Sequence, residues 1–181
     1  NDTFRRNRFD GCVKFVAKSG ETTYLDIDQI DVDNIDIIDK YKVITGAMTP
    51  GGGVQKSDTY TVINTPKIIE PYEVFSDYYY TLGVFNSLEE AKSFESYIRT
   101  KFARVLIQLI NNTTSFNANK FKYVPIQNWD TEWIDETLYQ KYNLTVDEIN
   151  FIEDLIKPMK SNSDKVEKDC IDFENFMNKP E

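Results

Sequence analysis

The strongest constraint on the fold is a long helical pattern in the middle of the chain. Apolar residues recur at steps of three and four between positions 88 and 109, which places them on one helical face. Ser87 precedes Glu90 by three residues, which is the spacing of a capping box, so the helix is expected to begin there. Beyond Phe102 the apolar residues spread around the helix, as they do when a helix is buried. The sequence therefore predicts one long central helix whose second half forms the core.

Segments rich in aromatic and β-branched residues predict the strands that pack on this helix. A turn at Gly20 would join the first two as a hairpin. Further helices are expected at 134–142, from Thr145 with a second capping box at Glu148, and at 165–177. The predicted class is α+β, a mainly antiparallel curved sheet on one long central helix with a helical C-terminal extension. The expected strands are 12–17, 22–30, 41–45, 59–63, 67–69, 78–85 and a last one within 121–129.

The same pattern suggests how the chain is divided. Residues 1–10 form a linker or a cut N-terminal end, since the chain begins at Asn1 without a methionine. Residues 11–130 form the main domain, 131–160 the helical extension, and 161–181 an acidic tail that carries the last helical pattern. Residues 1–10 include Arg5, Arg6 and Arg8, which fit either a basic arm on DNA or a solvated terminus.

Charge and composition limit the possible functions. The net charge is −9, and most of the excess acid lies after residue 130. Between Ser96 and Trp129 five cations occur without one acid, and such a cluster can attract phosphates on an acidic chain. The chain has no histidine, which excludes catalysis by histidine and zinc binding by histidine within it. Two distant cysteines fit no metal spacing, so reduced thiols in a cytoplasmic protein are expected. No apolar run is long enough to span a membrane.

Three motifs are weak signals of chemistry. Six aspartates lie between Asp26 and Asp39, but without the glycine and the final glutamate of a calcium loop, so no metal site is predicted. The glycine-rich segment 46–58 lacks P-loop spacing. Glu90-Ala91-Lys92 has the letters of a nuclease motif, yet it falls in the first turn of the central helix.

Several motifs together carry a resemblance to a known family. The order is an aromatic strand, Gly-Val-Phe, the helix with TKF, then YVPIQ and LYQKYNLTVDEI, within residues 41–159. It resembles the target-recognition (DNA-specificity) region of adenine-specific methyltransferases in bacterial restriction-modification systems, both the kind fused to an endonuclease and TaqI-type relatives. The catalytic motif of such enzymes, Asn/Asp-Pro-Pro-Tyr/Phe, is absent from this chain.

The resemblance implies a non-catalytic domain that binds double-stranded DNA and works with a methyltransferase domain of the same chain. The parent enzyme would use S-adenosylmethionine, with magnesium if it also cleaves DNA. Loops 46–58 and 111–122 are the candidates for base contact, with Gly51, Gly52, Gly53, Asn117 and Asn119. An alternative is a protein-interaction domain that uses the acidic helical tail, and an independent small enzyme is the least favoured. The expected phosphate contacts are Lys14, Lys18, Lys56, Arg99, Lys101, Arg104, Lys120 and Lys122.

Overall fold

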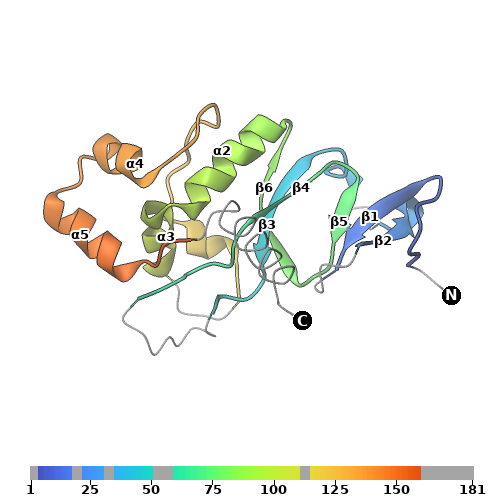
Figure 1. Ribbon diagram of the computed structural model, residues 1–181, viewed down its shortest axis with the longest axis horizontal. Helices are drawn as coiled ribbons and strands as arrows, with labels where there is room; N and C mark the ends of the chain where they lie inside the picture. Colours follow the sequence, from blue (N-terminus) through green and yellow to red (C-terminus); the bar gives the residue numbers. More distant parts are fainter. Residues whose placement is uncertain (1–3, 18–21, 31–34, 51–58, 111–114, 160–181) are drawn as a thin grey trace, which may run out of the picture.

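The chain folds into two small sheets and a group of helices that follow one another along the long axis of the molecule (Figure 1). The computed structural model describes residues 4–17, 22–30, 35–50, 59–110 and 115–159. The predicted α+β class is confirmed, but the strands form two separate three-stranded sheets. Among the described residues no helix has the length and apolar character needed to cross a membrane.

The first sheet has the order β2-β1-β5 and lies at the N-terminal end of the molecule (Figure 1). Strands β1 (Cys12–Val16) and β2 (Thr22–Asp26) form the predicted antiparallel hairpin. Strand β5 (Glu73–Phe75) pairs in parallel with β1 and was not predicted. The expected strand 22–30 ends early, because Asp26 accepts a hydrogen bond from the Asp28 backbone N–H and caps a short 3-10 helix η1 (Ile27–Gln29).

The second sheet has the order β4-β3-β6 and is entirely antiparallel. Its central strand β3 (Tyr41–Gly46) is buried along most of its length, as expected for a strand covered on both faces. The neighbours β4 (Lys67–Ile69) and β6 (Tyr79–Phe85) match the predicted segments closely. The register of β6 shifts opposite Val43 and Ile44, which marks a β-bulge.

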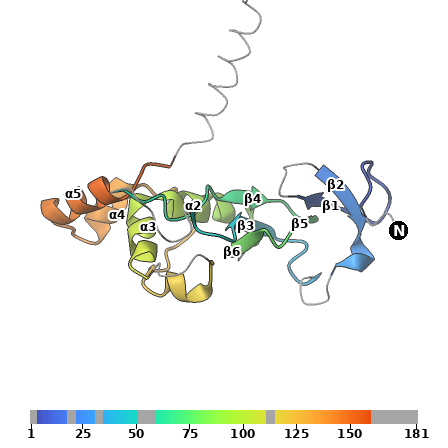
Figure 2. The same cartoon turned by 90° about the horizontal axis from the view of Figure 1, so that it is seen from below.

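The predicted central helix is in fact two helices, so that prediction is corrected. Helix α2 (Leu88–Arg99) starts at the predicted capping box, and α3 (Lys101–Gln108) follows after a break at Thr100. Thr100 has an extended backbone and is at once the last cap of α2 and the first cap of α3. Figures 1 and 2 show the two helices running in different directions.

Side-chain hydrogen bonds account for the break. The Thr100 hydroxyl accepts from the Ala103 N–H and donates to the Tyr97 carbonyl, so it replaces helical bonds at the junction. The Asp135 carboxylate accepts from the backbone N–H groups of Lys101 and Phe102, at 3.0 and 2.8 Å. The free donors at the start of α3 are therefore satisfied by a residue 33 and 34 positions away in sequence, which no local pattern predicts.

The C-terminal helices share the core of the central ones. Helices α4 (Asp135–Lys141) and α5 (Val146–Leu155) follow the predicted boundaries, and Thr145 and Glu148 form the expected capping box. The larger hydrophobic cluster joins both helices to α2, α3 and the segment 62–63. A smaller cluster around Val13, Leu25 and Ile38 supports the first sheet.

Two further strand predictions are wrong. Residues 59–63 form only an isolated parallel bridge, between Tyr60 and Ile156, because the backbone N–H and C=O of Tyr60 pair with the segment that ends α5. Segment 121–129 is not a strand, since a 3-10 helix η3 (Ala118–Phe121) precedes an irregular stretch. That stretch is held by the Tyr97 hydroxyl, which donates to the Pro125 carbonyl at 2.8 Å.

Candidate nucleic-acid interface

The structure brings the two loops proposed for base contact into direct contact. Met48 and Ser115 form an antiparallel bridge, and the Phe116 N–H donates to the Ala47 carbonyl at 3.0 Å. The same Ala47 donates its own N–H to the Tyr78 carbonyl at the start of β6. We call the exposed surface at this contact, made by Met48, Ser115, Asn117 and Asn119, the loop junction.

The first side of the loop junction is fixed by Asn64. The Asn64 side-chain amide donates to the Met48 carbonyl at 2.8 Å, and the Asn64 backbone carbonyl accepts from the Thr45 hydroxyl. β3 ends at Gly46, where an added Cβ would lie 2.6 Å from the Asn64 amide nitrogen. The glycine therefore allows the chain to leave the sheet beside Asn64 and present Met48 to solvent, where it is 50% exposed.

The second side is fixed by a buried aromatic ring. Phe116 is 7% exposed and packs against Tyr80 of β6 and Phe121 of η3, with ring centroids 5.9 and 6.0 Å apart. Figure 2 shows η3 beside α3, which gives this loop a rigid support. Asn117 and Asn119 follow the anchored Phe116 in sequence and are exposed, so their amides are presented from a backbone that is held in place.

Lys120 and Lys122 have different environments although they are two residues apart. Lys120 is 1% exposed, its ammonium lies 5.3 Å from the centre of the Phe116 ring, and burial lowers its pKa. Lys122 is exposed and lies over the Tyr123 ring at 5.6 Å. The expectation that both contact phosphate is therefore corrected for Lys120, whose charge supports the loop from inside.

Arg104 is also an internal residue, against the expectation that it contacts phosphate. It is 1% exposed, and its guanidinium donates to the carbonyls of Arg99, Thr100, Thr61 and Lys157 at 2.7–3.3 Å. Burial lowers its pKa to about 10. Because these carbonyls come from three separate segments, Arg104 joins the break between α2 and α3 to the loop at Thr61 and to Lys157 after α5.

Three more of the candidate cations form ion pairs with carboxylates. Lys14 pairs with Glu73 across β1 and β5, which raises the pKa of Lys14. Lys101 pairs with Glu153 of α5, and its side chain is 14% exposed. Arg99 pairs with Glu95 one turn earlier in α2 at 3.4 Å. The predicted cationic cluster is thus largely used within the fold. The candidates Lys18, Gly51, Gly52, Gly53 and Lys56 lie outside the described residues.

Sequence reasoning missed the apolar part of this surface. Met48 and Tyr123 are 50% and 55% exposed, and Tyr123 directly follows Lys122. The signal for Tyr123 was its place in a stretch of cations and amides, but that stretch was interpreted as a strand. No sequence signal links Met48 to Ser115, because 67 residues separate them.

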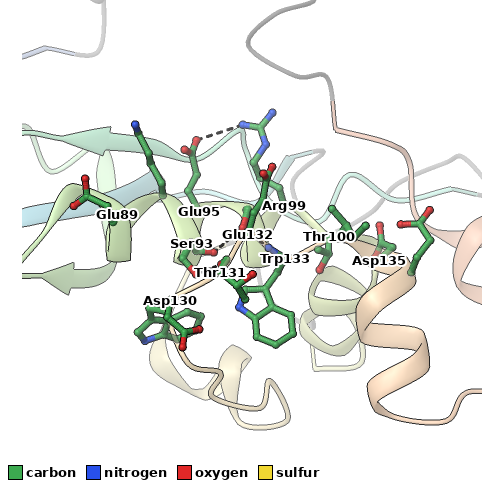
Figure 3. A pocket seen from close by; sticks show the side chains of 15 residues that line it. Glu89, Ser93, Glu95, Arg99, Thr100, Asp130, Thr131, Glu132, Trp133 and Asp135 are labelled. Carbon is green, nitrogen blue, oxygen red and sulfur yellow. Dashed lines mark hydrogen bonds and ion pairs between the residues drawn. The ribbon is translucent and has the colours of Figure 1, made fainter.

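A cleft of about 800 Å³ lies elsewhere, between α2 and the segment 129–136 (Figure 3). Its walls are joined by hydrogen bonds from the Ser93 hydroxyl to the Thr131 carbonyl and from the Trp133 N–H to the Ser96 hydroxyl. Six carboxylates and two cations line it, and burial raises the pKa of Glu95. This charge repels phosphate. The carboxylates are Glu89, Glu95, Asp130, Glu132, Asp135 and Glu136, and the cations are Lys92 and Arg99.

Comparison with protein-family models, with curated proteins and with solved structures finds no match for this chain.

Proposed function

We propose that this chain is a non-catalytic DNA target-recognition domain of a restriction-modification enzyme, which positions the duplex for adenine methylation by another domain. The observation that supports it best is the loop junction, where two loops distant in sequence meet, one with an exposed apolar side chain and the other with two exposed amides. Sequence reading requires side chains of this kind on an ordered backbone, since base edges are distinguished by hydrogen bonds and by the thymine methyl group.

Each side chain at or near the loop junction would make a different kind of contact with DNA in this proposal. Asn117 and Asn119 each carry two donors and one carbonyl acceptor, which is the combination that pairs with adenine in the major groove. Met48 offers an apolar contact to a thymine methyl group or a base face. Lys122, exposed beside Tyr123, is the phosphate contact that remains from the cluster between positions 96 and 129.

The remaining steps of the reaction belong to the parent chain in this proposal. A methyltransferase domain would bind S-adenosylmethionine and take the target adenine out of the stack, because the amino group cannot be reached inside a duplex. Cleavage, where the parent performs it, would require magnesium bound by a further domain. The parent protein would act in the cytoplasm, where its DNA substrate is found.

Selection from a library of random duplexes tests this function. The 181-residue chain is expected to enrich duplexes that share a short sequence, and Asn117→Ala/Asn119→Ala is expected to enrich a relaxed sequence at one or two positions. A matched control is Asn86→Ala/Asn150→Ala, which removes two exposed amides outside the loop junction. Enrichment of no sequence by the unaltered chain would contradict the proposal.

A second candidate function, a protein-interaction domain, is favoured by the acidic cleft. Its six carboxylates would receive a basic segment of a partner protein, and an arginine of that segment would contact Trp129, which is half-buried on the cleft wall. Glu89→Gln/Glu132→Gln alters two exposed carboxylates of the cleft. If this function is correct, the change weakens binding of an arginine-rich peptide and leaves DNA binding unchanged.

A further inference from the structure

The N-terminal segment 4–9, which we call the basic arm, is attached to the first sheet. Arg5 and Tyr24 of β2 exchange both of their backbone hydrogen bonds, each at 2.8 Å, so the arm adds a bridge to the outer edge of the hairpin. The Phe4 ring packs on Phe15 of β1 with centroids 4.8 Å apart. At the other end, Phe9 accepts a hydrogen bond at its carbonyl from the Cys12 N–H at 3.3 Å. The arm is thus held at its start and at its end.

Three exposed arginines project from this held backbone. Arg5, Arg6 and Arg8 are all exposed, and none of them makes an ion pair with another residue in the described ranges. Arg5 lies over the Phe9 ring at 4.4 Å, which leaves the edge of its guanidinium open to a further partner. The arm differs in this respect from Arg104, Lys101 and Lys14, whose charges are used inside the fold.

The two ends of the molecule differ in charge. Figure 1 shows the arm and first sheet at one end of the long axis and helices α4 and α5 at the other. Residues 131–159 hold seven carboxylates and two lysines, a net charge of −5. Near the arm the three arginines are matched in number by Asp10, Asp26 at the end of β2 and Asp28 in η1, so this end is close to neutral. A polyanion would therefore be repelled by the helical end and would meet exposed guanidinium groups at the arm end.

From this arrangement we propose that the basic arm is a second contact to the phosphate backbone of double-stranded DNA, separate from the loop junction. Guanidinium groups bind phosphate oxygens through paired hydrogen bonds, and arginines on a held backbone lose less freedom on binding than those of a free terminus. Phosphate contacts set the position of a domain on the duplex and carry no sequence information. The arm accordingly contributes to affinity and salt dependence, and the loop junction contributes to specificity.

This inference rests on the proposed function, and one titration series separates the two. Binding of the 181-residue chain to a random duplex is followed by fluorescence anisotropy from 50 to 300 mM salt, a range chosen because phosphate contacts respond to it. Arg6→Gln/Arg8→Gln is expected to reduce the salt slope of log K by about 2, since each phosphate contact contributes about 0.9. Lys92→Gln/Lys157→Gln removes the same charge from two exposed lysines elsewhere and should leave the slope unchanged.

The outcomes are distinct. Equal slopes for Arg6→Gln/Arg8→Gln and the unaltered chain would overturn the arm contact while the proposed function stands. Absence of DNA binding by the unaltered chain at 50 mM salt would overturn both. Loss of binding to phosphatidylserine vesicles with no change toward DNA would assign the arm to a lipid surface and would also overturn the proposal. Unchanged melting temperatures for both variants establish that folding is not the cause.

Discussion

Arg104 shows most clearly how this chain uses its cations. Its guanidinium donates to four backbone carbonyls at helix ends and in loops. Those of Thr61 and Thr100 also accept a backbone N–H, whereas those of Arg99 and Lys157 rely on the guanidinium among the hydrogen bonds described for them. Hydrogen bonds that involve a charged group are worth more than neutral ones, and an unpaired buried carbonyl costs free energy. The residue therefore contributes to stability and not to ligand binding.

Replacing Arg104 should destabilise the protein strongly. Arg104→Met keeps much of the apolar volume and removes all four hydrogen bonds, so the free energy of unfolding is expected to fall by about 3 kcal/mol or more. Urea unfolding measures this. Lys122→Met, at an exposed position, is the control and should change the value by less than about 0.5 kcal/mol. Similar effects of the two substitutions would contradict the assignment.

Lys42 predicts a dependence of stability on alkaline pH. It is 2% exposed, its ammonium donates to the carbonyls of Ile37, Ile38 and Lys40, and burial lowers its pKa to about 8. The unfolded chain keeps the lysine proton up to about pH 10.4, so between these values the unfolded state binds more protons. The free energy of unfolding should therefore rise from pH 8 to 10, by at most about 1.4 kcal/mol per pH unit.

Above this window Tyr97 acts in the opposite direction. Burial raises the pKa of Tyr97 to about 12, so the unfolded state loses its tyrosine proton first and stability falls from about pH 10. Lys42→Met should remove the rise between pH 8 and 10, whereas Lys40→Met, a half-buried neighbour, should retain it. Urea unfolding at pH 7, 8, 9 and 10 measures the slopes, and a rise that persists in Lys42→Met would refute the role of this lysine.

These residue environments could not be predicted from sequence. Lys120 and Lys122 lie in the same polar segment, yet one is buried against Phe116 and the other is exposed. The difference arises from η3, whose short turn directs the two side chains to opposite sides, and from the ring that occupies the interior. A count of cations along the chain does not show which side chains point to solvent and which point into the interior.

At the scale of elements, the end of β3 controls the loop junction. Gly46 has no Cβ, and this allows Asn64 to approach and hold the Met48 carbonyl. The backbone conformation of Gly46 does not require glycine. A larger residue is disfavoured because its Cβ would lie 2.6 Å from the Asn64 amide nitrogen.

Gly46→Ala is expected to lower the free energy of unfolding by about 1 kcal/mol, because the added methyl displaces the Asn64 side chain and breaks its bond to Met48. In an Asn64→Ala background the obstructing amide is absent, so the same substitution should cost less, with a coupling energy of about 0.5 kcal/mol or more. The double-mutant cycle is measured by urea unfolding. Additive effects would mean that the two residues do not restrict one another.

Local signals predicted the elements that depend on local bonds. The capping boxes at Ser87 and Thr145 and the β1–β2 hairpin follow from neighbouring residues, and the structure confirms them. The break at Thr100 was missed because Asp135 supplies half of its hydrogen bonds from a distant segment. Strand β5 was missed for a similar reason, since its three residues gain order from parallel pairing with β1.

At the scale of the whole molecule, the candidate interface is a product of topology. The sequence analysis proposed both loops of the junction for base contact. The structure brings them together through a bridge between Met48 and Ser115, which are 67 positions apart. The same folding withdraws Arg104 and Lys120 from the surface and pairs three other cations with carboxylates. The surviving positive surface is therefore smaller than composition suggested.

The central claim is that this chain binds duplex DNA through the loop junction, and an anisotropy titration of the 181-residue chain tests it most directly. Binding should weaken steeply with salt, by about 0.9 in log K per unit of log salt for each phosphate contact. Asn117→Ala/Asn119→Ala should weaken binding to a selected duplex and leave binding to random duplexes and the salt slope unchanged. Binding that is independent of salt, or no binding at 50 mM salt, would contradict the claim.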